Sequence, residues 1–349
     1  MASHNVSGRI EYELMSNNTA LIRLITFSDP SAAQVDRCQV NFEIWNAAGT
    51  VKIAEILNVP RINGPATDPN FPQLTCPNTT MGEYVTSTIK RNIYEATYTF
   101  DPGQRYQIYA WDLSRIDNII NISNSGSASF FVKSELTVSA ALASNRSPKI
   151  NNDTILTACV QQPWFNNLDI TDPDGDSLSF ARVPCQQYDP PTIPSPITSA
   201  GYASPDTFGG GYFWVGPMGN VVWQNTSNIL GPYTYALEIE EWRSGVQIGK
   251  VRYDATFFVV PGKCLVSSEK PLLQPQPKTE MTAFPNPTDD IINLTQKVDL
   301  VQLYDMQGKL LRVAERTDRL LVDDLPAGNY LLRVKDRSKG RSIRISIRR

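Results

Sequence analysis

Short segments in which apolar and polar residues alternate one by one dominate the sequence. In RIEYEL, Ile10, Tyr12 and Leu14 fall on one side and charged residues on the other. YEATYTF and YTYALEIE, which begin at Tyr94 and Tyr233, repeat the pattern. Successive side chains of a strand point to opposite faces, so a period of two predicts strands with one buried face. Helical periodicity is almost absent, and the chain is predicted to be all-β.

The strand segments are separated by frequent turn residues. The 349 residues include 20 glycines and 25 prolines, which recur at short intervals between the alternating segments. This spacing is typical of antiparallel β-sandwiches, and the length suffices for two or three such domains. We therefore expect tandem immunoglobulin-like β-sandwich modules.

Breaks in the alternation divide the chain into four parts. The first module is expected over residues 1–142 and the second over residues 143–264, with the polar connector ASNRSPKINNDT at their junction. Residues 265–280 contain three prolines and are predicted to be an exposed, extended linker. Residues 281–349 carry further strand and turn patterns and are predicted to form a small β-sandwich of their own.

Charge and hydropathy exclude several classes of partner. The formal net charge is −3, which gives no reason to expect a nucleic acid or a membrane surface as partner. No run approaches the roughly 18 apolar residues of a membrane span. The opening MASHNVSGRI passes directly into a predicted strand and contains no signal peptide.

The five cysteines are isolated along the chain. They form no CxxC pair or Cys/His cluster, so the pattern does not support a zinc site. In an oxidising compartment, Cys159 could pair with Cys264 because these two bracket the second module. Cys38 and Cys76 lie within the first module and could form another pair, which would leave Cys185 free. The connectivity stays open at this level.

One acidic motif could bind a metal ion. In DPDGDSL, Asp172, Asp174 and Asp176 alternate around a proline and a glycine. Three converging carboxylates could provide oxygen ligands for Ca²⁺, which takes six to eight of them. The alternative is a tight turn in which the aspartates cap backbone N–H groups.

Residues that could perform catalysis are scarce. His4 is the only histidine and lies at the extreme N-terminus, which argues against a Ser-His-Asp or Cys-His site. Glu240, Glu241 and Trp242 form the nearest acid–aromatic cluster, and most such clusters are solvated strand faces. Paired carboxylates for glycoside hydrolysis stay open, because acidic residues are numerous. We predict no catalytic residue and no cofactor other than the possible Ca²⁺.

Aromatic residues are concentrated in the second module. They are expected to be mostly core, with a surface that stacks on a sugar or a protein partner as the alternative. The residues concerned are Trp164, Phe165, Tyr212, Phe213, Trp214 and Trp223.

The terminal unit resembles a known family. FPNPTDDIINL, VQLYDMQGKLL, LPAGNYLLRV and a basic final strand follow one another in the order and spacing of the type A C-terminal sorting domain of type IX secretion cargo. The resemblance implies that the type IX secretion machinery is a partner and that the protein is secreted or displayed on the outer cell surface. It also implies removal of the domain at that surface.

The preceding modules resemble gliding-motility-associated surface proteins. The matching segments include NRSPKI, DPDGDSLSF and GPYTYALEIEEW in the second module, and ASHNVSGRIEYEL at the start of the first. This resemblance implies that Met1 is an initiator standing where a signal peptide was removed.

These features together predict a non-enzymatic extracellular or cell-surface protein that serves adhesion, surface coating or assembly, with a surface glycan or a protein as possible ligand. The alternative is a calcium-dependent carbohydrate-binding or hydrolytic exoprotein.

Overall fold

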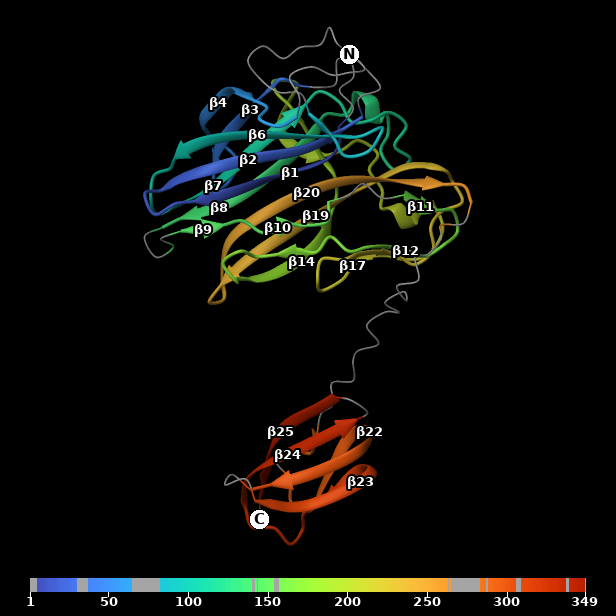
Figure 1. Ribbon diagram of the computed structural model, residues 1–349. Helices are drawn as coiled ribbons and strands as arrows, with labels where there is room; N and C mark the ends of the chain where they lie inside the picture. The colour runs from blue at the N-terminus through green and yellow to red at the C-terminus, as the bar shows by residue number, and fades with distance from the viewer. Residues whose placement is uncertain are drawn as a thin grey trace. The chain divides into compact units, whose positions relative to one another are not determined.

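The computed structural model describes residues 5–29, 37–64, 82–139, 142, 144–153, 157–262, 264, 283–286, 288–305, 309–336 and 339–348. The chain forms two compact units, Met1–Cys264 and Leu265–Arg349 (Figure 1). The predicted linker over residues 265–280 lies outside the described residues. In the described part of the chain, no helix combines the length and apolar character needed to cross a membrane.

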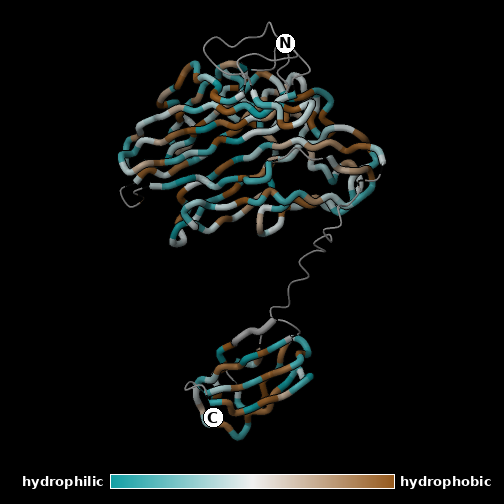
Figure 2. The backbone as a smooth tube through the Cα atoms, viewed as in Figure 1, coloured by the Kyte–Doolittle hydropathy of each residue, from teal (hydrophilic) through white to brown (hydrophobic). Residues whose placement is uncertain are grey.

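Strands and two short 3-10 helices, η1 and η2, build the larger unit. Its first half contains β1 (Asn5–Leu14), β2 (Thr19–Ser28), β3 (Gln39–Asn46), β4 (Lys52–Pro60), β5 (Glu83–Tyr84), β6 (Lys90–Thr99), β7 (Gln104–Asp112), η1 (Ser125–Ser127) and β8 (Phe130–Val138). Its second half contains β9 (Asn145–Arg146), β10 (Lys149–Ile150), β11 (Thr157–Cys159), β12 (Trp164–Asn166), β13 (Ile170–Thr171), β14 (Ser177–Val183), β15 (Gln186–Asp189), β16 (Ile193–Thr198), η2 (Pro205–Phe208), β17 (Phe213–Val215), β18 (Val221–Trp223), β19 (Gly231–Arg243) and β20 (Val246–Val260). The predicted all-β class is confirmed. Figure 2 shows apolar and polar residues alternating along many of these strands.

One 13-stranded sheet runs through both halves of the larger unit. Its main path is β4-β3-β7-β8-β20-β1-β2-β6-β5, and β19 joins β20 to β14. One edge of β20 pairs with β19 along nearly its whole length. The other edge is shared in turn by β8 at Gly249–Val251, by β1 at Asp254–Ala255 and by β11 at Phe258–Val260. The pairing with β11 is parallel, whereas β8, β1 and β19 are antiparallel to β20.

The boundary expected between residues 1–142 and 143–264 is not a break in the structure. Each half has a hydrophobic core of its own, but a third cluster joins Val6 and Ile25 of the first half to Cys185 and Ala236 of the second. The reason is the length of β20, whose second edge remains available to strands of the first half after β19 has paired with the first edge. The two halves therefore form one compact unit.

Strand β1 departs from the half-buried pattern that its alternation predicts. Ile10, Tyr12 and Leu14 are buried as expected, but Arg9 and Glu11 on the opposite face are buried as well. The Arg9 guanidinium donates to Glu11 Oε1 over 2.8 Å and to Asp153 Oδ2 over 2.9 Å. The second half of the unit thus covers the face that the sequence assigns to solvent, and ion pairing satisfies the buried charges.

The smaller unit consists of β21 (Ala283–Phe284), β22 (Ile291–Tyr304), β23 (Leu310–Leu321), β24 (Gly328–Asp336) and β25 (Lys339–Ile347). β22 pairs with β23 on one side and with β24 on the other, and β24 pairs with β25. Ile345 and Ile347 are buried in its core, as the alternation in RSIRISIRR predicts.

Candidate functional site: an acidic turn and an aromatic sheet face

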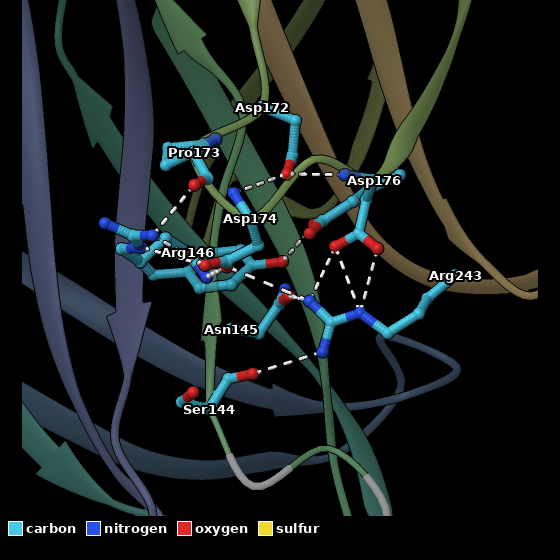
Figure 3. Close-up of polar contacts among 10 residues, drawn as sticks. Ser144, Asn145, Arg146, Asp172, Pro173, Asp174, Asp176 and Arg243 are labelled. Atoms are coloured by element: carbon cyan, nitrogen blue, oxygen red, sulfur yellow. Dashed lines mark hydrogen bonds and ion pairs between the residues drawn. The ribbon is translucent and has the colours of Figure 1, made fainter.

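The three aspartates of DPDGDSL converge in a turn between β13 and β14. One carboxylate oxygen from each of Asp172, Asp174 and Asp176 lies within 4.8 Å of the others. Asp172 Oδ1 accepts the backbone N–H groups of Asp174 at 2.9 Å and of Asp176 at 3.0 Å (Figure 3). The turn is therefore closed by a side-chain cap of the kind that aspartate favours.

Two arginines pair with the other two carboxylates of the turn. Arg146 donates through Nε and Nη2 to Asp174 Oδ1, at 3.0 and 2.8 Å, and its backbone N–H donates to Asp174 Oδ2 at 2.7 Å. Arg243 donates two hydrogen bonds to Asp176, from Nη2 to Oδ2 at 2.6 Å and from Nε to Oδ1 at 2.8 Å (Figure 3). These contacts compensate the negative charges that a cation would otherwise neutralise. The geometry thus favours the capped turn, in which Asp174 and Asp176 are already paired with guanidinium groups.

A fourth acidic residue, Glu241 of β19, is buried near this turn. Its exposed fraction is 0%, the Tyr12 hydroxyl donates to its Oε2 over 3.2 Å, and its Oε1 has no hydrogen-bond partner among the described residues. Burial, together with the charges of Asp172 and Asp176, raises the pKa of Glu241 to about 8. The carboxyl group therefore keeps its proton to a higher pH than an ordinary glutamate does.

Sequence reasoning assigned Glu241 to a solvated face and missed its burial. The signal was present: Glu241 continues the series Tyr233, Tyr235, Leu237 and Ile239, all of which are buried. A period of two places it on the core face.

The acid–aromatic cluster at residues 240–242 does not form a carboxylate pair for hydrolysis. Glu240 carries its charge on the opposite face from Glu241, where Lys250 Nζ lies 3.3 Å from its Oε1 and Ser179 donates to its Oε2. Trp242 Nε1 donates to the Ser179 hydroxyl at 2.9 Å. Because Glu241 is fully buried, the two carboxyl groups cannot flank one sugar substrate.

The aromatic concentration of the second half divides between two faces of a small sheet. This sheet has the order β12-β18-β17. Trp164, Phe213 and Trp223 are buried on its inner face, and the Trp164 ring stacks on Phe257 with 4.2 Å between ring centroids. The prediction that the aromatics are mostly core holds for these three.

The remaining aromatics lie on the outer face of the same sheet. Phe165 is 43% exposed, Tyr212 is 77% exposed and Trp214 is half-buried. Phe165 and Trp214 both pair with Val222, so the three side chains form one row across the strands. The structure thus places half of the predicted aromatic set on the surface.

Two cavities among the described residues have a volume of about 20 Å³ each, which is enough for roughly one water molecule. One is lined by core residues of the first half, including Leu24 and Phe130, and the other lies beside Tyr12 and Arg146. Neither could enclose a sugar or a cofactor.

The cysteine expectations are met in part. Cys159 and Cys264 form the predicted disulfide, with their Cα atoms 5.4 Å apart. Cys185 is a buried free thiol, as predicted. Cys38 is disulfide-bonded, but Cys76, its expected partner, lies outside the described residues, as does His4.

Comparisons with known proteins identify the smaller unit. Residues 282–348 match the family model for a secretion system C-terminal sorting domain, which agrees with the motifs of this segment. A sorting domain of this kind indicates a secreted or cell-surface protein and implies an interaction with the type IX secretion machinery. No curated protein matches the chain.

A search of solved structures finds the N-terminal eight Ig domains of Down Syndrome Cell Adhesion Molecule (DSCAM) isoform 1.30.30. The sequence identity is 11%, the TM-score is 0.17, and the match covers 95% of this chain and 34% of that one. The chain thus spans about a third of that structure, and so weak a likeness says nothing about function.

Proposed function

Since residues 282–348 form a secretion sorting domain, we propose that the larger unit is the functional cargo, a non-enzymatic binding module that serves adhesion, coating or assembly at the cell surface. The resemblance of its segments to gliding-motility-associated surface proteins supports the same role. The sorting domain is the observation that carries the proposal, because it sets the compartment in which the larger unit acts.

Three features of the larger unit support binding over catalysis. The described cavities admit about one water molecule, Glu241 is inaccessible, and arginines pair with two of the three aspartates of the acidic turn. A carbohydrate-binding exoprotein is the second candidate, favoured by the exposed aromatic row of β12, β18 and β17. A hydrolytic exoprotein has less support, since the acidic cluster at residues 240–242 lacks two accessible carboxylates on one face.

Export can be tested by truncation. We would express the full chain and a chain ending at Cys264 with a signal peptide in cells that carry the type IX machinery. The full chain should reach the surface or the medium, and the truncated chain should accumulate in the periplasm in folded form, because residues 1–264 are a compact unit. Tyr212→Ala, a highly exposed position of the larger unit, is the control and should be exported normally.

Surface delivery of the truncated chain would contradict the sorting role. The non-enzymatic character has a separate test, in which the purified larger unit is incubated with a panel of polysaccharides and peptides. Release of reducing sugars or of new amino termini above background would contradict it.

A further inference from the structure

The outer face of the β12-β18-β17 sheet combines aromatic rings with side-chain amides. Besides the row of Phe165, Val222 and Trp214, the backbone N–H of Gln224 donates to the Tyr212 carbonyl at 2.9 Å, which places these two residues opposite each other. We call the outward side chains of Phe165, Asn220, Tyr212, Trp214, Val222 and Gln224 the aromatic face.

Two glycines make room for the amides on this face. A Cβ atom at Gly211 would lie 2.9 Å from Gln224 Oε1, and one at Gly216 would lie 2.4 Å from Asn220 Oδ1. Both distances are shorter than normal contacts, so any other residue would push the amides away. The amides of Asn220 and Gln224 thus lie close to the two glycines that flank β17.

The inner side of the sheet holds the face rigid. Trp223 Nε1 donates to the Gly211 carbonyl at 3.0 Å, and Phe213 packs edge-on against the Trp223 ring with 6.0 Å between centroids. Arg182 fixes the edge of β17 by donating to the Phe213 carbonyl at 2.7 Å. These contacts hold the backbone from which the outward rings and amides extend, which limits the entropy that the strands lose when a ligand binds.

The face is electrically neutral. None of its six side chains is charged, and Arg182 at its edge is 3.6 Å from Asp206, which offsets its charge. An acidic or basic partner would find no complementary charge here. A neutral sugar chain fits, because the C–H faces of its rings stack on aromatic rings and its hydroxyl groups bond to amides.

We propose that the aromatic face binds a neutral polysaccharide, with Tyr212, Trp214 and Phe165 as stacking residues and Asn220 and Gln224 as hydroxyl partners. This inference rests on the proposed function, since it supplies the ligand of the surface binding module. It needs no metal ion, because the aspartates of the acidic turn take no part in the face.

The test is titration calorimetry of the full chain with cellohexaose, chitohexaose and laminarihexaose, with a hexamer of galacturonate as the charged comparison. At least one neutral oligomer should bind, and the galacturonate should not. Tyr212→Ala and Trp214→Ala should each raise the dissociation constant roughly fivefold, which corresponds to the usual free energy of one aromatic contact. Tyr212→Phe should bind like the parent because it keeps the ring. Leu57→Ala changes an exposed apolar residue of β4 and serves as the matched control.

Several outcomes would overturn the proposal. These are no binding to any neutral oligomer, or binding that Tyr212→Ala and Trp214→Ala leave unchanged. Sedimentation of the same variants provides a second readout: if the parent self-associates and both variants are monomers, the face is an interface between copies of this chain. None of these results would change the outcome of the export experiment or of the test for hydrolysis. The proposed function can therefore hold even if this inference fails.

Discussion

Arg115 and Asp254 form a doubly hydrogen-bonded ion pair that is completely buried between the two halves of the larger unit. Nη1 lies 2.6 Å from Oδ1 and Nη2 lies 2.7 Å from Oδ2, and both side chains are 0% exposed. Burial alone would lower the pKa of Arg115, but the Asp254 carboxylate more than offsets this and raises it. The pair links the chain after β7 to the centre of β20.

Asp254→Ala should be strongly destabilising. The substitution leaves the Arg115 charge buried without its counter-ion, which costs about 3–5 kcal/mol in comparable cases. The measurement is chemical unfolding of residues 1–264. Glu83→Ala, which breaks the exposed pair of Glu83 with Arg91, is the matched control and should cost less than about 1 kcal/mol. Equal effects of the two substitutions would show that the buried pair does not join the halves.

Stability should fall as the pH rises from about 5 to 8, because of Glu241. Its folded-state pKa of about 8 lies above the usual glutamate pKa of about 4.5. In this window the folded protein keeps a proton that the unfolded chain has lost, so raising the pH favours unfolding. The free energy of unfolding should decrease by up to about 1.4 kcal/mol per pH unit.

The control for this pH dependence is Glu241→Gln, which keeps the shape but cannot ionise. Unfolding curves of the parent and the variant at three pH values give the comparison. The free energy of unfolding of the variant should not decrease with pH in this way. The variant should therefore become increasingly more stable than the parent toward pH 8. Parallel slopes in the two proteins would mean that Glu241 titrates normally.

The Cys159–Cys264 disulfide should contribute about 5 kcal/mol to the stability of the larger unit. It closes a loop with a sequence separation of 105 residues, and in the chain-entropy model a loop of this length restricts the unfolded chain by about that amount. A double Cys→Ser variant is preferable to a reductant, because Cys38 is also disulfide-bonded. Peptide mapping of native protein checks the bond, and free alkylatable thiols at both positions would refute it.

Calcium should leave the melting temperature of the parent protein nearly unchanged. Arg146 and Arg243 already occupy the carboxylates of Asp174 and Asp176. Replacing both arginines with glutamine exposes the converging carboxylates, and millimolar Ca²⁺ should then stabilise the variant by mass action. Calorimetry in chelator, Ca²⁺ and Mg²⁺ measures both proteins. A rise of several degrees in the parent with Ca²⁺ alone would establish a calcium site instead of a capped turn.

The alternation in the sequence predicted the strands well, because it depends only on neighbouring residues within each strand. Strands β1, β6, β19 and β25 lie at or close to the segments with a period of two. The pairing of β1 with β20 joins residues about 250 positions apart, and no local pattern encodes it. The fusion of the two predicted modules, and the burial of Arg9 and Arg115, follow from that pairing and could not be predicted.

The candidate surface was only partly readable from the sequence. Trp164 and Phe165 are adjacent on one strand, and Phe213 and Trp214 on another. Adjacent strand residues point to opposite faces, so both pairs had to divide between core and surface. Which member of each pair faces outward depends on where the core lies, and that information comes from β19 and β20.

The disulfide at the end of β20 has a mechanical consequence for any form of the protein that is pulled through the residues after Cys264. Tension from the tail enters the larger unit at Cys264, just beyond β20. There the sulfur link passes part of the load to β11, which runs parallel to β20 and pairs with its last three residues. A pull therefore cannot peel β20 from its free end one hydrogen bond at a time. It must load two strands at once, so the lifetime under force is set by the rate at which β20 and β11 open together.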